Sequence, residues 1–358
     1  MSEEIPLLPL PIGTVLNNRF QLQKAFAAGG FSLVYRAVDV STAEVVIIKE
    51  CAPTGMVYRD EAQNIQLVNP QNATSFQRIV DNTVEEANLL YTLTTQGVTG
   101  ITRYIDGFHA YNTFFVVMSE ARGFDLHTWT ETFRSKGAGF PPDLLQKTLT
   151  SILVILGQIH AAGYFHCDIK PANILIDESG EVTIIDLGAA RSPQKQHDDT
   201  VAISPGFSPP EFYPGNRGQI GAWTDIYMLG AMIYNMITGK VPPPADERLG
   251  RDLFVQICSM TDLLKYYPEA LLASVDKAME IDAKERFHST ETWRTFYDRR
   301  KAAPKIHRAH EKQKHNPVFG VNDLSTKRAT KTSSGMSNVT FFIILITMIA
   351  ATVYICRL

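Results

Sequence analysis

The sequence predicts an α+β fold in two regions, a small antiparallel β-sheet with one helix and then a larger, mainly helical region, followed by a C-terminal transmembrane helix. Three patterns lead to this prediction. Strand-like alternation runs through residues 19–49, helical spacing of apolar residues dominates beyond Gly123, and residues 339–356 contain no charged side chain. With 358 residues, of which 45% are hydrophobic, the composition excludes a disordered, collagen-like or disulfide-stapled chain.

The first region is expected to form the sheet. Polar and apolar residues alternate over 19–24, a glycine turn follows at 27–30, and the β-branched run 45–48 is typical of a buried strand. After an irregular stretch from Cys51 to about Ala73, apolar residues recur at helical spacing over 76–90. A second strand pair is expected around 104–118, which would close this region.

The second region is expected to be helical. A helix with a broad apolar face is predicted from Pro142 to Gly163, with proline in its first turn. The segment 225–238 is apolar nearly all round, with Thr224 as its N-cap and Gly239 at its C-terminal end, so it should lie in the middle of the helical region. Between these two helices, a β-hairpin is predicted over 174–185.

The formal charge of −3 combines segments of opposite sign. Residues 301–338 contain eight Lys or Arg and two acidic residues, and Arg357 adds another positive charge, which leaves −10 for residues 1–300. A basic neck therefore follows an acidic body. Because phosphate contacts require a basic face, the acidic body argues against a general nucleic-acid binder.

The C-terminal segment 339–356 is predicted to span a membrane. It has 18 uncharged residues, of which 15 are apolar, and at 1.5 Å per residue a helix there would be about 27 Å long, close to the hydrocarbon thickness of a bilayer. The alternative is a buried core helix or an oligomer contact. The basic residues before the span favour a cytoplasmic body. The acidic start Ser2-Glu3-Glu4 is unlike a signal peptide, so we expect a single-pass C-terminal tail anchor.

The four cysteines lie far apart in the sequence. Cys51, Cys167, Cys258 and Cys356 form no CxxC pair. Neither a zinc site nor a disulfide framework is therefore expected, which agrees with a reducing compartment.

Polar residues that could do chemistry stand at both outer ends of the predicted hairpin. His166-Cys167-Asp168-Ile169-Lys170-Pro171-Ala172-Asn173 precedes it, and Asp186-Leu187-Gly188 follows it. With these motifs the chain resembles a eukaryotic-type Ser/Thr protein kinase over about residues 17–298. The resemblance implies a bilobal protein-kinase-like fold. Its segments would be an N-terminal extension (1–16), a kinase domain (17–300, with an N-lobe of about 17–120 and a C-lobe of about 121–300), a basic flexible juxtamembrane linker (301–338) and the transmembrane helix (339–356).

The resemblance also implies an ATP site. Val46-Ile47-Ile48-Lys49 resembles the third-strand lysine motif, so Lys49 would hold the α and β phosphates of ATP. Its ion-pair partner would be Glu86, with Glu85 as the competitor. The phosphate loop would be Ala27, Ala28, Gly29, Gly30, Phe31 and Ser32, followed by Val34. Met118 would be the gatekeeper, and the hinge that contacts adenine would be Ser119, Glu120 and Ala121.

The catalytic roles follow from the same resemblance. Asp168 would accept or orient the proton of the substrate hydroxyl, and Lys170, which is typical of Ser/Thr kinases, would contact the γ-phosphate. Asn173 and Asp186 would be ligands of Mg²⁺, with Mn²⁺ as the alternative metal, since an amide oxygen and a carboxylate are hard donors.

Supporting motifs agree with this assignment. Glu211, in a Pro-Pro-Glu segment, would pair with Arg286, and Asp225 would fasten the catalytic loop. Ser204 occupies a position that carries a hydroxyl in Ser/Thr kinases. The Ile48-Lys49-Glu50 run, followed by Pro53, and the use of Pro-Pro-Glu resemble bacterial members of the family.

Two positions depart from the family pattern. Ala27 and Ser32 replace the first and third glycines of the phosphate loop, which would lower nucleotide affinity or turnover. Cys167 stands where many kinases carry an arginine that reads a phosphate on the activation segment. Strict dependence on phosphorylation is therefore not expected, although Ser192, Thr200 and Ser204 are candidate autophosphorylation sites.

Three functions fit these residues. The first is a membrane-tethered Ser/Thr kinase that acts on protein substrates and on itself. The second is a pseudokinase that serves as a membrane-anchored scaffold, which the altered phosphate loop favours. The third is a small-molecule kinase on the same fold, which Lys170 and the Pro-Pro-Glu segment argue against. The motifs leave the oligomeric state and the sequence preference for substrates undetermined.

Overall fold

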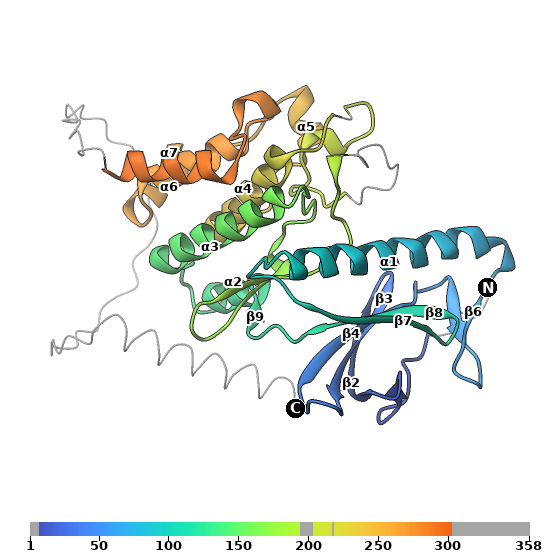
Figure 1. The fold of residues 1–358 in the computed structure, drawn as a ribbon. Coiled ribbons are helices and arrows are strands. Elements are labelled where there is room, and N and C mark those ends of the chain that lie inside the picture. Colours follow the sequence, from blue (N-terminus) through green and yellow to red (C-terminus); the bar gives the residue numbers. More distant parts are fainter. Residues whose placement is uncertain (1–6, 194–202, 217, 303–358) are drawn as a thin grey trace, which may run out of the picture. The chain divides into compact units, whose positions relative to one another are not determined.

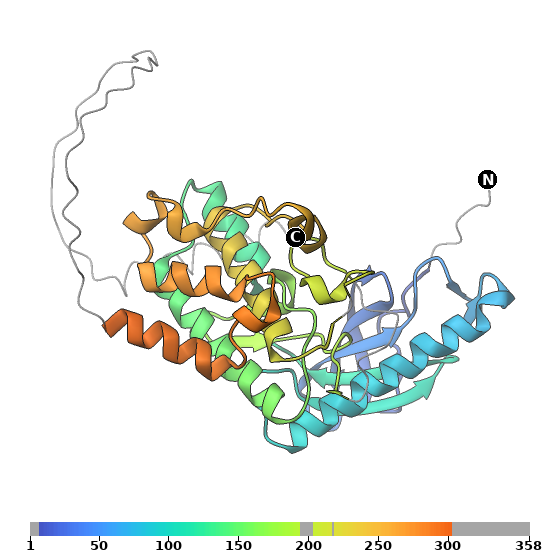
Figure 2. The same ribbon diagram turned by 90° about the horizontal axis from the view of Figure 1, so that it is seen from above.

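The computed structural model describes residues 7–193, 203–216 and 218–302, and those up to Lys301 belong to one compact unit. In this unit a β-sheet with one long helix occupies one side and the remaining helices the other (Figures 1 and 2). This is the predicted α+β, two-lobed arrangement. The predicted transmembrane helix 339–356 and nearly all of the basic neck 301–338 lie outside the described residues.

The N-lobe contains a six-stranded antiparallel sheet in the order β1-β2-β3-β4-β8-β7. Its strands are β1 (Val15–Leu16), β2 (Phe20–Gly29), β3 (Ser32–Asp39), β4 (Val45–Cys51), β7 (Tyr104–Ala110) and β8 (Thr113–Ser119). Successive side chains of a strand point to opposite faces. On β4, the side chains of Lys49 and Glu50 therefore point to opposite faces of the sheet.

One face of this sheet packs against α1 (Ala73–Thr95), which lies along the sheet in Figure 1. The apolar contacts on this side involve buried residues from the helix and from the neighbouring strands β4 and β8, namely Cys51, Val80, Ala87, Phe114 and Val116. The helix extends beyond the predicted range at both ends, because only the apolar positions 76–90 gave the sequence signal. This packing fixes α1 against β4 and β8.

The opposite face is covered by segments that sequence patterns did not identify. Residues 51–73, expected to be irregular, contain a hairpin of β5 (Val57–Arg59) and β6 (Ile65–Leu67). Strands this short give no clear alternation; the hairpin is stabilised because Val57 and Ile65 bury against the sheet. Leu10, from the expected N-terminal extension, is buried in the same cluster.

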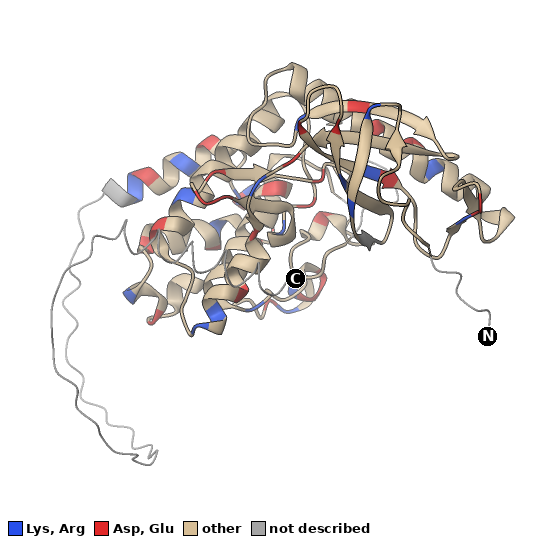
Figure 3. Cartoon of the chain, turned by 90° about the horizontal axis from the view of Figure 1, so that it is seen from below, with Lys and Arg blue, Asp and Glu red and all other residues tan. Residues whose placement is uncertain are grey.

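The C-lobe is built from helices around α4 (Ala222–Thr238), which is buried along nearly its whole length. Around it lie α2 (Leu126–Ser135), α3 (Pro142–Ala161), α5 (Ala245–Gly250), α6 (Glu269–Ala278) and α7 (Thr290–Ala302). Acidic and basic residues alternate along α7 (Figure 3), and Arg294 pairs with Glu291 at 3.5 Å.

The ends of α4 test two expectations. The helix ends at Gly239 with φ +77°, as predicted, because the left-handed conformation favours glycine. The prediction of Thr224 as N-cap was wrong, since the cap is Gly221. Thr224 lies one turn further in, where its hydroxyl accepts from the Gly221 N–H at 3.2 Å and donates to Glu211 Oε1 at 2.9 Å.

Among the described helices, only α3 is long and apolar enough to cross a bilayer, and half of that stretch is buried in the lobe, as a core helix would be.

A three-stranded sheet lies next to the junction of the lobes, in the order β11-β10-β9. It joins the predicted hairpin, β10 (Ile174–Ile176) and β11 (Val182–Ile184), to β9 (Phe124–Asp125). Gly123 allows this close approach: its φ is +100°, and a Cβ there would lie 2.1 Å from the carbonyl oxygen of Ile176.

Candidate active site

Lys49, at the end of β4, connects the two lobes through its ammonium group. Its Nζ lies 2.8 Å from both carboxylate oxygens of Glu86 on α1 and 3.0 Å from Oδ1 of Asp186, which follows β11. The sequence left Glu85 and Glu86 as alternatives. The ion pair is with Glu86, whereas Glu85 lies on an exposed position of α1.

Lys49 stabilises the charges of both carboxylates in this triad, but burial and the nearby charge of Asp186 outweigh Lys49 at Glu86 and raise the pKa of Glu86. Burial disfavours the charged form of Lys49, but the carboxylates of Glu86 and Asp186 outweigh it and raise the pKa of Lys49. Burial also favours the neutral form of Asp186, but Lys49 and the backbone N–H of Gly188 lower the pKa of Asp186 to about 2. At neutral pH the triad therefore presents a fixed cation and an ionised carboxylate.

Asp186 adopts an uncommon backbone conformation, with φ +63°. Its Oδ1 accepts a hydrogen bond from Gly188 N at 3.3 Å. A side chain at position 188 would be crowded, because a Cβ there would lie 3.2 Å from Asp186 Oδ1 and from Glu86 Oε2. Gly188 therefore permits the carboxylates to approach Lys49.

The catalytic-loop residues gather on Asp168. Lys170 Nζ donates to Asp168 Oδ2 at 2.7 Å, and Asn173 Nδ2 donates to the same oxygen at 2.8 Å and to the Asp168 carbonyl at 2.9 Å. Among the described residues, all hydrogen bonds to this carboxylate fall on Oδ2. Oδ1 is left as a hydrogen-bond acceptor.

Asp225, on the buried helix α4, anchors the loop that carries Asp168. It is fully buried, and its carboxylate accepts the backbone N–H groups of His166 and Cys167, each at 2.8 Å, and contacts His160 Nε2 at 2.8 Å. Burial opposes its charge, but these hydrogen bonds and the nearby histidines lower the pKa of Asp225. Cys167 is held at φ +63° by this anchorage.

The β10–β11 hairpin brings Asn173 and Asp186 together, because Ile185 N donates to the Asn173 carbonyl at 2.9 Å. The side chain of Asn173 uses its Nδ2 for both bonds to Asp168, so its amide oxygen remains as an acceptor. An amide oxygen and an ionised carboxylate are the donors that Mg²⁺ prefers. The two residues thus fit a Mg²⁺ site at this end of the hairpin.

The predicted adenine contacts lie on the same face of the sheet as Lys49. Val34 is the cross-strand partner of Lys49, and Met118 is the partner of Ile47, two residues before it. The predicted hinge begins at Ser119, whose N–H donates to the Arg103 carbonyl at 2.9 Å. Its next residue, Glu120, pairs with Arg36 at 2.7 Å, and Ala121 is half-buried.

The predicted phosphate loop joins β2 to β3. The backbone of Ala27, Ala28 and Gly29 belongs to β2, the turn is Gly30-Phe31, and Ser32 opens β3 opposite Gly29. A bulge between Phe26 and Gly29 interrupts the ladder. Phe31 is 66% exposed, and no atom lies within 4 Å of a Cβ built on Gly30, so the turn has room for a ligand.

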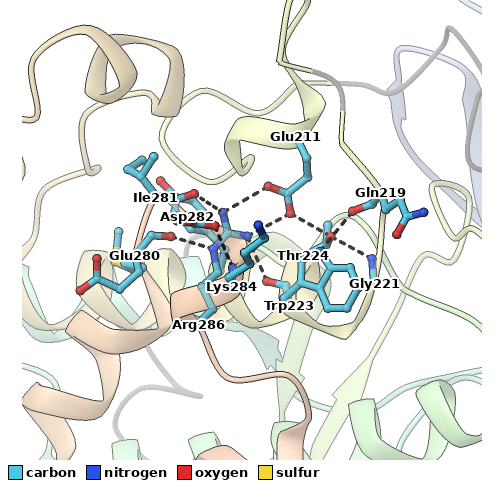
Figure 4. A network of polar contacts seen from close by, with 12 residues as sticks. Glu211, Gln219, Gly221, Trp223, Thr224, Glu280, Ile281, Asp282, Lys284 and Arg286 are labelled. Atoms are coloured by element: carbon cyan, nitrogen blue, oxygen red, sulfur yellow. Dashed lines mark hydrogen bonds and ion pairs between the residues drawn. The ribbon is translucent and has the colours of Figure 1, made fainter.

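Glu211 and Arg286 form a buried ion pair in the C-lobe, which Figure 4 shows. Arg286 Nη1 and Nη2 donate to the two Glu211 oxygens at 2.9 and 3.2 Å, and the same guanidinium donates to the carbonyls of Glu280 and Ile281. Thr224 donates to Glu211 from α4. The pair ties the segment before α4 to the segment before α7.

Comparisons with known proteins match this chain to protein kinases. Residues 20–297 match the protein kinase domain family. A probable serine/threonine-protein kinase of Clostridium perfringens is 26% identical over 284 residues, and PknB, a probable serine/threonine-protein kinase of Lactococcus lactis, is 25% identical over 332 residues. Among solved structures, the PpkA-294 apo form aligns with a TM-score of 0.71 at 26% identity, covering 81% of this chain and 99% of that one.

This chain therefore belongs to the protein kinase domain family. Both curated relatives are named as probable serine/threonine-protein kinases. The alignments cover 78% and 89% of this chain but 38% and 49% of the two curated relatives, so it spans less than half the length of each.

The motifs assigned no role to a cluster of buried polar residues behind the site. Glu50, Tyr35 and Arg59 meet on the sheet face opposite Lys49. A signal for it was present in the strand pattern: alternation places Glu50 on the same face as Val46 and Ile48, where a carboxylate would need a buried partner.

Proposed function

We propose that this chain transfers the γ-phosphate of ATP to Ser and Thr hydroxyls of protein substrates, including itself. The observation that carries the proposal is the position of Lys49 between Glu86 and Asp186, at 2.8 and 3.0 Å, with Lys170 and Asn173 bound to Asp168. These four contacts supply the charges and the base that phosphoryl transfer requires.

In this proposal each residue has one task. Lys49, held by Glu86, binds the α and β phosphates. Asp168, fixed through Oδ2, takes the proton of the substrate hydroxyl at Oδ1, and Lys170 neutralises charge on the transferred phosphoryl group. Mg²⁺ bound by Asn173 and Asp186 would neutralise phosphate charge and orient the phosphates.

The experiment is a transfer assay with the full-length protein in detergent, ATP, Mg²⁺ and a generic basic protein. Asp168→Asn and Lys49→Met serve as inactive controls. Phosphate transfer to Ser or Thr above both controls is expected. Transfer no higher than in the controls, with nucleotide binding retained, would instead support a scaffold; transfer only to a small molecule would support the third function.

We further propose that activity does not depend on phosphorylation of the activation segment. Cys167 stands in place of an arginine, and a thiol carries no positive charge with which to bind a phosphate. It is also 2% exposed, and its burial raises the pKa of the thiol well above its usual value. Ser192 and Ser204 are half-buried, and Thr200 lies outside the described residues. Replacing all three with Ala should leave turnover intact; loss of turnover with ATP binding retained would contradict this.

The last part of the proposal concerns localisation. We propose that residues 339–356 anchor the protein in a membrane, with the catalytic body in the cytoplasm and the basic neck 301–338 against anionic lipid. Carbonate extraction of cell membranes tests the anchor. The protein should stay in the membrane pellet, whereas release into the supernatant would contradict the span.

A further inference from the structure

Glu50 is a charged residue in an apolar environment. It immediately follows Lys49 on β4, is fully buried, and shares a sheet face with the hydrophobic cluster that includes Leu10, Ile48 and Val57. Burial raises the pKa of Glu50, which Arg59 opposes. Burying a carboxylate is costly unless it is paired, so its contacts are informative.

Both carboxylate oxygens of Glu50 accept hydrogen bonds. Arg59 Nη2 donates to Oε1 and Oε2, each at 2.8 Å, and the hydroxyl of Tyr35 donates to Oε2 at 2.6 Å. The side chains of Arg59 and Glu50 are 3% and 0% exposed. This is a closed cluster of three polar side chains, which we call the Glu50 cluster.

The Glu50 cluster joins three parts of the N-lobe. Arg59 also donates to the carbonyls of Leu8 and Gln63, at 3.0 and 2.8 Å, and Leu10 N donates to the Tyr35 hydroxyl at 3.0 Å. The N-terminal segment and the β5–β6 hairpin are thereby fastened to the two strands that carry Tyr35 and Glu50.

The strand that the cluster holds also carries the phosphate-binding groups. Lys49 is adjacent to Glu50 and points to the opposite face, so the register and twist of β4 at Glu50 set the position of the Lys49 ammonium. Two residues beyond Glu50, Ala52 N donates to the Phe31 carbonyl, and Thr54 N donates to the Gly30 carbonyl, both at 3.0 Å. The same segment therefore holds the turn of the phosphate loop.

Stability alone does not account for the Glu50 cluster. A buried ion pair is often no more stabilising than apolar residues of similar volume, because desolvation offsets the attraction between the charges. Such a pair does impose one geometry on the segments that carry it. That geometry matters here, because Ala27 and Ser32 replace two glycines of the phosphate loop, and the loop needs a defined backbone position to bind phosphate.

We propose that Glu50 is a positioning residue for ATP, which through Arg59 and Tyr35 fixes Lys49 and the Gly30-Phe31 turn relative to the N-terminal segment. This inference rests on the proposed kinase function. It gives residues 7–13 and the β5–β6 hairpin a role in nucleotide binding although they lie on the far face of the sheet.

The test compares nucleotide affinity with thermal stability in the full-length protein. The double variant Glu50→Leu/Arg59→Met removes both charges and keeps similar volume, and Tyr35→Phe removes only the hydroxyl. Arg19→Met is the matched control, because it breaks another N-lobe ion pair, with Asp39 at 2.6 Å, away from Lys49. Affinity is measured by titration with a fluorescent ATP analogue and Mg²⁺, well below each melting temperature.

We expect the double variant to melt near the wild type and to bind nucleotide about tenfold more weakly, a difference of about 1.4 kcal/mol. Tyr35→Phe should show a smaller loss, and Arg19→Met should bind as the wild type does even if it melts earlier. Wild-type affinity in the double variant would overturn the proposal, as would losses that follow melting temperature in all three variants. If the double variant does not fold, unchanged affinity in Tyr35→Phe overturns it.

The same proteins separate this inference from the proposed function. Weakened nucleotide binding in the variants, with no phosphate transfer by the wild type, would support the positioning role and contradict the kinase function. Transfer by the wild type, with unaffected variants, would do the reverse. A wild type that binds no nucleotide would overturn the positioning role.

Discussion

The carboxylate of Asp225 accepts a hydrogen bond from the backbone N–H of Cys167 at 2.8 Å, so a residue of α4 fixes the peptide next to Asp168. The helix is the most buried of the described C-lobe helices, and the loop it holds carries the proposed base. The position of Asp168 is thus determined by the core of the lobe and not by the loop alone.

Asp225→Asn should loosen this loop and destabilise the protein. An asparagine keeps one acceptor oxygen but places an NH2 donor against the N–H of either His166 or Cys167, so we expect a loss of about 3 kcal/mol of unfolding free energy. Transfer activity should fall with it. Urea unfolding followed by far-UV circular dichroism measures the stability, and a variant as stable as the wild type would contradict the anchoring role.

The pH dependence of the same variant gives an independent test. Because the pKa of Asp225 is lowered from 3.8 in the folded state, its contribution is complete above about pH 4 and is lost as pH falls through the folded-state value. Between wild type and Asp225→Asn, the difference in unfolding free energy should be constant from about pH 5 to 7, a range that lies above the usual aspartate pKa of 3.8. The difference should shrink below about pH 4. A difference that grows on acidification would contradict this sign.

Lys49→Met should abolish the charge balance of the site. It removes the cation between Glu86 and Asp186, and we expect phosphate transfer to fall by about 100-fold or more. Lys265→Met is the control, because Lys265 also pairs with an aspartate, Asp262 at 2.6 Å, but on the C-lobe surface. Steady-state kinetics should show wild-type rates for the control; equal losses in both would contradict a specific role for Lys49.

Arg286→Ala should be far more destabilising than removal of a surface arginine. It leaves Glu211 buried without its partner, which costs about 3–5 kcal/mol. Arg294→Ala breaks only the exposed pair with Glu291 and should change stability by about 0.5 kcal/mol at most. Chemical denaturation of the two variants side by side measures the contrast, and similar losses would mean that the Glu211–Arg286 pair is not a brace.

Thiol reactivity should follow burial. Burial raises the pKa of Cys51, Cys167 and Cys258, but the first two are buried, while Cys258 is partly exposed. With iodoacetamide at pH 8, we expect Cys258 to be alkylated first among these three, as measured by peptide mass spectrometry. Rapid alkylation of Cys167 in the folded protein would show that its loop opens.

The sequence alone determined the fold class, because strand alternation over 19–49 and the apolar helix after Asp225 carry strong periodic signals. It also predicted roles for Lys49, Asp168, Asn173 and Asp186, because these predictions depend on residue type and spacing within short motifs. Local signals of this kind need no knowledge of distant contacts.

The tertiary structure decided what depends on contacts between distant segments. It paired Lys49 with Glu86 across 37 residues and placed Arg59 on Glu50. The three-residue strands β5 and β6 are too short to give a periodic pattern, and they exist because Val57 and Ile65 bury against the sheet. Burial of Glu50 likewise depends on the residues that fold over β4, so its role could be inferred only once the N-terminal segment was seen to pack there.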